Sequence, residues 1–274
     1  MTDTLSTLDD SRTPRRVRHD TRRRLLTVQK VDHLTPRMVR ITLTGDLDGF
    51  TSLGFDDHVK LIFPLPGESR PVVPESAGAP VPEGLMPSPM RDFTPRHYDA
   101  KANTLEIDFA LHDAGPATDW AARAKPGDLL GVGGPRGSFV IPTNFDWHLL
   151  IGDETALPAI SRRLMELPAG SRAVVIGEVD GPDDRLTFES SATVEVHWAY
   201  RNGAEPGTGD ALAKALKGVT PPNGDYYAWV ACESQVAKSL RQILISDFAA
   251  NPKWTKAAGY WRRGATAIHE KHED

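Results

Sequence analysis

The feature that most constrains the fold is a change of hydrophobic period near residue 144. Between about Leu25 and Ile141, apolar side chains alternate with polar ones over short segments. This period of two is typical of strands that bury one face and expose the other. After Asn144, short apolar runs alternate with segments whose apolar residues recur at helical spacing. The chain therefore combines two architectures in succession.

The first half predicts an antiparallel β-barrel. Val39, Ile41 and Leu43 fall on one face of a strand, and the same alternation recurs over residues 105–111. Turn residues separate the strands, as in Lys-Pro-Gly-Asp at 125–128, and a barrel is the economical closure for many short strands. Residues 64–89 are rich in proline and glycine, which excludes a central strand. We expect this segment to be a long surface loop between two barrel strands.

The second half predicts an α/β domain with a mostly parallel sheet. We expect strands at 148–152, 173–179, 194–200 and 226–231, and helices at 156–167 and 211–216. A last helix is expected to begin at a cap on Ser234. In such sheets, ligands bind at the carboxyl ends of the strands. The expected domains are a basic, flexible arm at 1–24, a barrel at 25–143, and an α/β domain with a C-terminal extension at 144–274.

Composition narrows the functional classes. The hydrophobic content of 39% and the charged content of 25% are those of a globular protein, and no apolar run is long enough to cross a bilayer. The single cysteine, Cys232, and the lack of an apolar secretory segment lead us to expect a cytoplasmic monomer. The net charge of −5 argues against nucleic acid as a partner. The arginine-rich arm lacks aromatic residues that would stack on bases, so we interpret it as solvated.

The segment Arg91-Asp92-Phe93-Thr94-Pro95-Arg96 offers three groups that a flavin needs. The Arg91 guanidinium can bind a pyrophosphate, and the Phe93 ring can cover the isoalloxazine. The Thr94 hydroxyl can hydrogen-bond near N5, which makes Thr94 the catalytic candidate. In strand geometry, Arg91 and Phe93 share one face and Thr94 and Arg96 the other. The alternative is an ordinary solvated strand.

A second segment follows at a separation suited to one cofactor. Asp108–His112 ends a strand, and Gly115–Trp120 opens a short helix. A glycine-bearing turn before a helix can present N–H groups to a phosphate. The alternative is a plain turn with a core tryptophan. The FAD contacts predicted here are Asp108, His112, Gly115, Pro116, Ala117, Thr118 and Trp120.

With these motifs, the sequence resembles the siderophore-interacting proteins, FAD-dependent ferric-siderophore reductases related to ferredoxin–NADP reductases. The family's barrel motif is Arg-x-Tyr-Thr-x-Arg, and here Phe93 stands in the tyrosine position, which keeps the ring and loses the phenol. The resemblance covers about residues 25–264, and further segments at 57–61, 134–139, 152–158 and 260–264 carry it.

The resemblance implies NADH or NADPH as electron donor, and a ferredoxin stays open as an alternative. The candidate nicotinamide contacts are Asp153, Glu154, Thr155, Ala156 and Arg201. The two carboxylates would stabilise a helix N-terminus and repel a phosphate. We therefore expect the nicotinamide end of the donor at 152–158 and its phosphates near Arg201.

The resemblance also implies basic residues that bind an anionic ferric siderophore, and Lys60, Arg96 and Arg262 are the candidates. The histidines show no metal-ligand spacing, so no metal site is expected. The expected reaction is electron transfer from NAD(P)H through FAD to Fe(III), with release of Fe(II) for iron assimilation. Two alternatives remain. One is a flavin reductase with another acceptor, such as a ferredoxin, a quinone or a simple ferric chelate. The other is a flavin-free siderophore-binding module.

Overall fold

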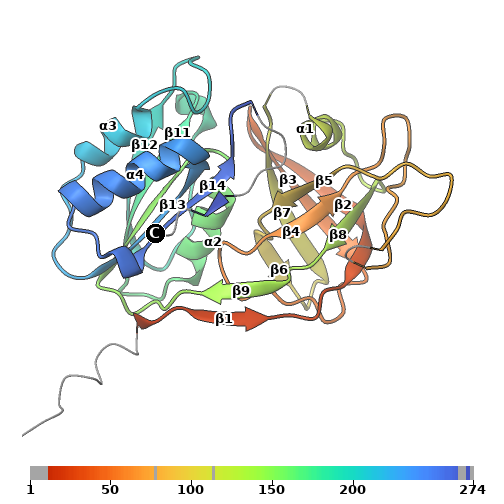
Figure 1. The fold of residues 1–274 in the computed structure, drawn as a ribbon, viewed down its shortest axis with the longest axis horizontal. Helices are drawn as coiled ribbons and strands as arrows, with labels where there is room; N and C mark the ends of the chain where they lie inside the picture. Colours follow the sequence, from red (N-terminus) through yellow and green to blue (C-terminus); the bar gives the residue numbers. More distant parts are fainter. Residues whose placement is uncertain (1–11, 77–78, 113–114, 265–269, 272–274) are drawn as a thin grey trace, which may run out of the picture. The chain divides into compact units, whose positions relative to one another are not determined.

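The computed structural model describes the chain from residue 12 onward, except residues 77–78, 113–114, 265–269 and 272–274 (Figure 1). The chain divides into two compact units, Val17–Ser138 and Phe139–Asp274, and the second also takes in the N-terminal residues up to Arg16. The division falls a few residues before the boundary expected at 143/144. The two units are described separately below.

The first unit is built on a seven-stranded antiparallel sheet in the order β5-β4-β8-β2-β3-β7-β6. Its inner faces enclose one hydrophobic core, so the predicted antiparallel barrel is confirmed. The six-residue helix α1 (Pro116–Ala121) follows β7. The strands are β2 (Arg23–Thr35), β3 (Met38–Gly45), β4 (Val59–Ile62), β5 (Met90–Phe93), β6 (His97–Asp99), β7 (Thr104–Ala110) and β8 (Leu129–Gly133).

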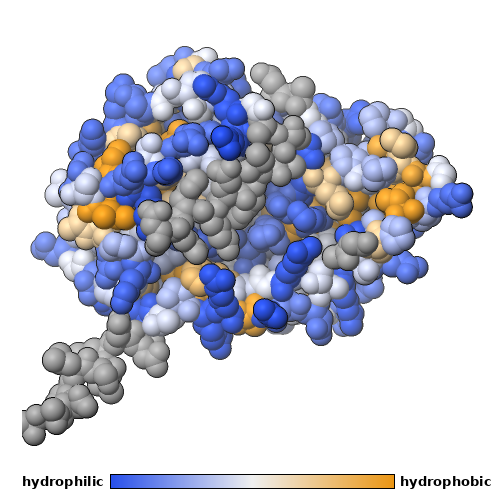
Figure 2. Space-filling view, viewed as in Figure 1, coloured by the Kyte–Doolittle hydropathy of each residue, from blue (hydrophilic) through white to orange (hydrophobic). Residues whose placement is uncertain are grey.

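A long loop joins β4 to β5, as the proline-rich segment predicts. The Phe63 N–H donates to the Pro89 carbonyl at 2.9 Å, which closes the base of the loop. Leu85 and Met86 are 53% and 68% exposed. Figure 2 shows hydrophobic surface over this loop. The loop therefore exposes large apolar side chains to water, a feature that often marks a binding surface.

The predicted flexible arm is wrong for its described part. Arg15–Arg18 form strand β1, which pairs with β9 (Gly137–Val140) in a two-stranded sheet, and β2 already begins at Arg23. Arg12 forms an ion pair with Asp225 at 2.6 Å. Strand pairing thus gives this segment a defined backbone, while the side chains of Arg15, Arg16 and Arg18 stay exposed, as the solvated interpretation expects.

The second unit is a six-stranded sheet in the order β12-β11-β10-β13-β14-β15, parallel except for β15. The helices α3 and α4 share one hydrophobic core with alternate strand residues, and α2 packs on β10 and β11. The strand order reverses between β10 and β13, which is where sheets of this kind bind ligands. The elements are β10 (Trp147–Gly152), α2 (Leu157–Glu166), β11 (Arg172–Val179), η2 (Pro182–Asp184), β12 (Thr193–Tyr200), α3 (Ala211–Lys217), β13 (Tyr226–Glu233), α4 (Ser234–Asp247), η3 (Pro252–Trp254), β14 (Thr255–Trp261) and β15 (Glu270–Lys271).

The cap of α4 corrects one prediction. Glu233 is the N-cap, and its carboxylate accepts hydrogen bonds from the N–H groups of Gln235 at 2.7 Å and Val236 at 3.1 Å. Ser234, the predicted cap, is fully buried against Gly259, where an added Cβ would lie 2.6 Å from the Ser234 hydroxyl oxygen. None of the helices in the described chain has the length and apolar character that crossing a bilayer demands.

Candidate functional site

Strand β5 carries the predicted flavin contacts. In the described sheet it is an edge strand paired with β4, with Val59 opposite Phe93 and Lys60 opposite Asp92. Because opposite residues share a face, Arg91 and Phe93 lie on the inner face with the fully buried Val59. Lys60 and Asp92 lie on the outer face. The predicted common face of Arg91 and Phe93 is therefore present.

The groups around β5 fit the demands of a flavin. One Arg91 Nη donates to the Met90 carbonyl at 2.8 Å, and within the described chain no carboxylate neutralises this guanidinium. The strand ends at Phe93, so the shared strand face predicted for Thr94 and Arg96 is not formed. Thr94 is buried, and its hydroxyl makes no hydrogen bond to any described residue. A cation, a ring and a hydroxyl are thus available within four consecutive positions.

An aromatic cluster brings the two predicted FAD segments together. The ring centroids of Phe93 and Phe109 are 4.5 Å apart, and those of Phe109 and Trp120 are 5.9 Å apart. Phe63 contacts the same cluster, with its centroid 5.8 Å from that of Trp120. Trp120 is only 5% exposed and belongs to the barrel core. The core interpretation of Trp120 therefore prevails over the predicted cofactor contact.

Asp108 and Arg96 belong to a buried group of charged side chains that also includes Arg40. The Asp108 carboxylate accepts two hydrogen bonds from the Arg40 guanidinium, at 2.7 and 2.9 Å, and the Arg96 Nε lies 3.9 Å away. The hydrogen bond to Asp108 raises the pKa of Arg40. Asp108 and Arg96 are 3% and 6% exposed. Their burial argues against the predicted contacts of Asp108 with FAD and of Arg96 with a bulky chelate, so we do not carry these two roles forward.

The predicted diphosphate turn lies at the start of α1. His112 is exposed, Gly115 is the N-cap residue, and residues 113–114 lie outside the described chain. Pro116 occupies the first turn, where its missing N–H costs no intrahelical bond. Gly115, Pro116, Ala117 and Thr118 are half-buried. These residues keep the predicted cofactor contacts as part of the proposal below.

The outer face of the same unit holds a basic pocket of about 170 Å³. It contains one predicted substrate residue, Lys60, whose Nζ lies 2.8 Å from the Asp92 carboxylate. The exposed Arg136 has no ion-pair partner in the described chain, and the Arg23 Nη1 reaches only the Pro74 carbonyl, at 3.5 Å. The lining residues are Thr21, Arg23, His58, Lys60, Gly133, Gly134 and Arg136.

Arg23, His58 and Arg136 line this pocket, and the sequence alone does not single them out as substrate contacts. Arg136 lies within the quoted segment 134–139, whose conspicuous glycines gave a signal that was not assigned to substrate. From the sequence, Arg23 is assigned to the flexible arm. Its place in the pocket depends on the pairing of β2 with β8, which sets Arg23 opposite Gly133. A pocket assembled from three strands has no local sequence signature.

In the second unit, a buried acidic cluster lies at the carboxyl ends of the parallel strands. Asp153 is 4% exposed and follows β10 directly. One carboxylate oxygen accepts hydrogen bonds from the Thr155 N–H at 3.0 Å and hydroxyl at 2.6 Å, and the other accepts from the Trp261 indole N–H at 2.8 Å. Burial first, and the Glu154 charge second, raise the pKa of Asp153 to about 6.

Arg201 is held inside this cluster. One Nη donates to Glu154 at 2.6 Å, the other also bonds Glu154, and Glu178 lies 3.5 Å away. Burial raises the pKa of Glu178 to about 7, with a further contribution from the Asp153 charge. The Arg201 side chain is only 6% exposed, so the predicted phosphate contact is not available. Ala156 is fully buried and likewise offers no contact surface.

The described residues at this edge do not fit a pyrophosphate. Gly152 serves close packing, because an added Cβ would lie 2.6 Å from the Ala231 carbonyl oxygen. Cys232 is buried among carboxylates, and burial raises the pKa of its thiol well above the usual value. Arg262, the third predicted substrate residue, is exposed and follows β14 in this unit.

An antiparallel barrel followed along the chain by a five-stranded parallel sheet, whose strand order reverses between β10 and β13, is the fold of ferredoxin reductases. The fold is shared with the ferredoxin reductase of carbazole 1,9a-dioxygenase, which is 16% identical, with a TM-score of 0.59 and coverage of 85% of this chain and 66% of that one.

More specific matches name the family. Residues 27–139 match the siderophore-interacting FAD-binding domain, and residues 145–264 match the siderophore-interacting protein family model. The chain belongs to the siderophore-interacting protein family.

Its relatives include proteins named as reductases. The NADPH-dependent ferric-chelate reductase of Escherichia coli K12 is 39% identical, over 91% of this chain and 97% of that protein. The ferric vibriobactin reductase ViuB of Vibrio cholerae is 34% identical, over 90% and 93%. The crystal structure of a siderophore utilization protein from T. fusca is similar at a TM-score of 0.85 and 40% identity, covering 94% of this chain and 98% of that one.

Proposed function

We propose that this protein is an FAD-dependent reductase that delivers electrons to the iron of ferric siderophores. The observation that carries the proposal is the register of β4 against β5. Lys60 of the basic pocket lies opposite Asp92, between the two flavin-contact candidates Arg91 and Phe93. Neighbouring strands are about 5 Å apart, so an anion in the pocket lies one strand away from β5 along the sheet, on the face opposite to the Arg91 and Phe93 side chains.

Three groups of the flavin segment have distinct roles in this proposal. The Arg91 guanidinium neutralises the cofactor's diphosphate, and the Phe93 ring packs against its apolar surface. The Thr94 hydroxyl offers a hydrogen bond at the reactive edge. Residues 112 and 115–118 complete the diphosphate contacts. When bound, FAD accepts a hydride and passes electrons on singly, which nicotinamide alone does not do readily.

The basic pocket binds the substrate. Ferric siderophores surround Fe(III) with hard oxygen ligands and many carry negative charge, which Lys60, Arg23 and Arg136 attract. After reduction, the softer and less charged Fe(II) is held more weakly by the same ligands, so iron is released. These residues bind and orient the chelate. The reaction needs no general base or nucleophile from the chain.

The electron donor is proposed to be NADPH or NADH, and we place the reaction in the cytoplasm, where both are available. The name of the Escherichia coli relative supports NADPH, whereas at the acidic edge of the α/β unit the Arg201 side chain is enclosed by carboxylates and does not reach a phosphate. No step is assigned to residues of that edge. A ferredoxin is the competing donor.

The test is an anaerobic assay of the purified protein. A flavin absorbance spectrum, followed by trapped Fe(II) appearing with NADPH or NADH and ferric siderophores, supports the proposal. Equal rates on quinones and simple ferric chelates would indicate a general flavin reductase. A colourless protein that takes up no FAD would indicate the alternative function, a flavin-free siderophore-binding module.

A further inference from the structure

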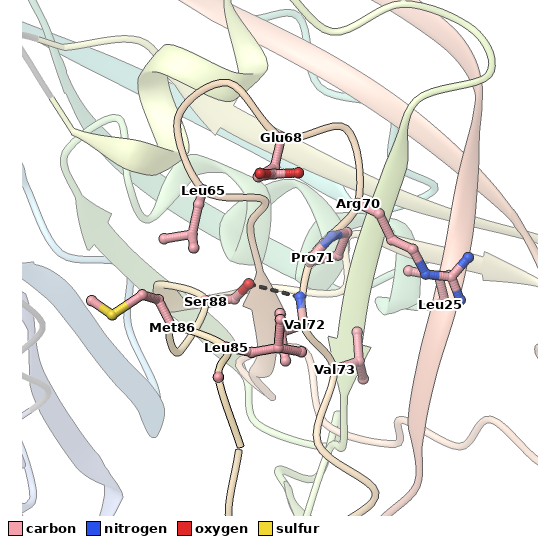
Figure 3. Close-up of a pocket in the computed structure, with 11 residues that line it drawn as sticks. Leu25, Leu65, Glu68, Arg70, Pro71, Val72, Val73, Leu85, Met86 and Ser88 are labelled. Atoms are coloured by element: carbon pink, nitrogen blue, oxygen red, sulfur yellow. Dashed lines mark hydrogen bonds between the residues drawn. The ribbon is translucent and has the colours of Figure 1, made fainter. Parts of the chain in front are cut away.

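A second, larger pocket lies in the same unit, under the loop between β4 and β5. Its volume is about 570 Å³, and its walls come from loop residues within 65–73 and 84–88 and from Leu25 of β2 (Figure 3). The Val72 N–H donates to the Ser88 hydroxyl at 2.8 Å, which ties the two arms of the loop together. Most of the lining is apolar, with Leu65, Val73, Leu85 and Met86 contributing side chains.

Strand register places this apolar pocket directly beside the basic pocket. Across β2, β8 and β4, the residues Arg23, Gly133 and Lys60 form one row, and all three line the basic pocket. The next row on the same face, two residues along each strand, is Leu25, Gly131 and Ile62. Of this second row, Leu25 lines the larger pocket. Two residues span about 7 Å of strand, so Leu25 of the larger pocket follows Arg23 of the basic pocket on the same face of β2.

Gly131 and Gly133 of β8 have no side chains, so this part of the outer face of the sheet is not covered by β8 side chains. A Cβ at Gly131 would lie 2.8 Å from both the Ile62 Cβ and the Val73 Cγ2, so the loop can pack here only on a glycine. A Cβ at Gly133 would meet the Arg23 Cγ at 3.5 Å, an ordinary contact, so packing does not require that glycine. Its absent side chain instead opens the basic pocket.

The loop itself marks the boundary between the pockets. Pro74, the neighbour of Val73, accepts the hydrogen bond from Arg23 at 3.5 Å. The segment 73–74 thus belongs to the larger pocket through Val73 and contacts the basic pocket through the hydrogen bond from Arg23 to Pro74. The basic pocket presents Arg23, Lys60 and Arg136. The larger pocket presents the exposed apolar side chains of Leu85 and Met86, and Glu68 and Arg70 are its charged lining residues.

We propose that the apolar pocket binds a hydrophobic arm, aromatic or short alkyl, of a ferric chelate whose anionic iron core occupies the basic pocket. This inference rests on the proposed function and adds the substrate class, namely amphiphilic chelates. The apolar arm would be removed from water by Leu25, Leu85 and Met86, which gives those loop side chains a ligand to cover.

The test compares two probes with the same iron-binding group. These are the ferric complexes of catechol and of tert-butylcatechol, prepared at equal ligand excess, with the full chain loaded with FAD. The wild type is expected to show an apparent KM for the tert-butyl complex about five-fold lower or more, since each buried methylene contributes about 0.8 kcal/mol. In the double variant Leu85→Ser, Met86→Ser, the KM ratio should fall to about one.

A matched control is Leu53→Ser, which changes a leucine 45% exposed on the same unit but outside both pockets. It should keep the wild-type ratio. Equal KM values for both probes in the wild type, with iron still reduced, would overturn this inference and leave the proposed function standing. Reduction of neither probe, and of no ferric siderophore under the same conditions, would instead reject the proposed function. A double variant that changes only the sedimentation mass, at an unchanged ratio, would show that the patch joins copies of the chain and would also overturn the inference.

Discussion

Replacing Lys60 by glutamine tests the basic pocket by removing one charge at nearly constant size. The Lys60 side chain is 44% exposed and its Nζ lies 2.8 Å from Asp92. Exposed ion pairs contribute about 0.2–1 kcal/mol to stability, so the variant should stay folded, with a Tm within a few degrees of the wild type. Any large effect on the chelate is then an effect on binding.

The size of that effect follows from Coulomb's law. At about 5 Å, two unit charges interact by roughly 0.8 kcal/mol in water and roughly 3 kcal/mol at an effective dielectric constant of 20. Half-exposure and the Asp92 carboxylate place Lys60 near the lower value. A loss of about 1 kcal/mol corresponds to a roughly five-fold higher Kd or KM for an anionic chelate. At 1 M salt the Debye length is about 3 Å, and the difference should shrink below about two-fold.

The assay is the initial rate of Fe(II) trapping over a range of chelate concentrations, at low and high salt. Lys30→Gln is the matched control, because Lys30 also lies in the barrel unit and its Nζ also lies 2.8 Å from a carboxylate, that of Asp32. Asp92→Asn should act in the opposite direction and lower the KM, since it frees the charge of Lys60. The account of the pocket fails if Lys60→Gln leaves the KM unchanged, or if Lys30→Gln raises it equally.

Three further predictions concern the cofactor, the outer face and pH. Arg91→Ala should purify with little or no FAD by visible absorbance, and full occupancy would refute the motif assignment. Gly131→Ala should lower stability by about 1–3 kcal/mol through overpacking, whereas Gly133→Ala should melt like the wild type and raise the chelate KM. Burial raises the pKa of Glu178 from 4.5 to about 7, so its contribution to stability is present below about 4.5 and lost as pH rises to 7. Thermal melts across this range should show a declining Tm that Glu178→Gln flattens, and an unchanged slope in the variant would contradict the assignment.

Periodicity was sufficient to predict both folds. Alternation in the first half and helical spacing in the second depend on local burial, which the sequence carries directly. The cap of α4 was missed because a glutamate one position before the serine supplies the oxygen. The arginine arm was misjudged because its order comes from pairing with β9, more than a hundred residues away.

The sequence predicts those site residues that lie close together along the chain, and it does not predict contacts between residues that are far apart in sequence. Arg91, Phe93 and Thr94 lie within four positions of one segment, so their residue types alone suggested a flavin. Arg96 and Arg201 were assigned to anions because a sequence does not show which carboxylate each one meets. In the fold, Asp108 lies beside Arg96, and Glu154 binds Arg201 from 47 residues away. Arg23 joins the pocket through its register opposite Gly133, which side-chain type does not encode.

The most direct measurement of the central claim bypasses the electron donor. The FAD-loaded protein is reduced chemically under anaerobic conditions, mixed with a ferric siderophore, and followed by flavin absorbance and an Fe(II) trap. The account predicts reoxidation of the flavin with roughly two Fe(II) trapped per flavin, because each iron takes one electron. A flavin that stays reduced in the presence of excess ferric siderophore would contradict it.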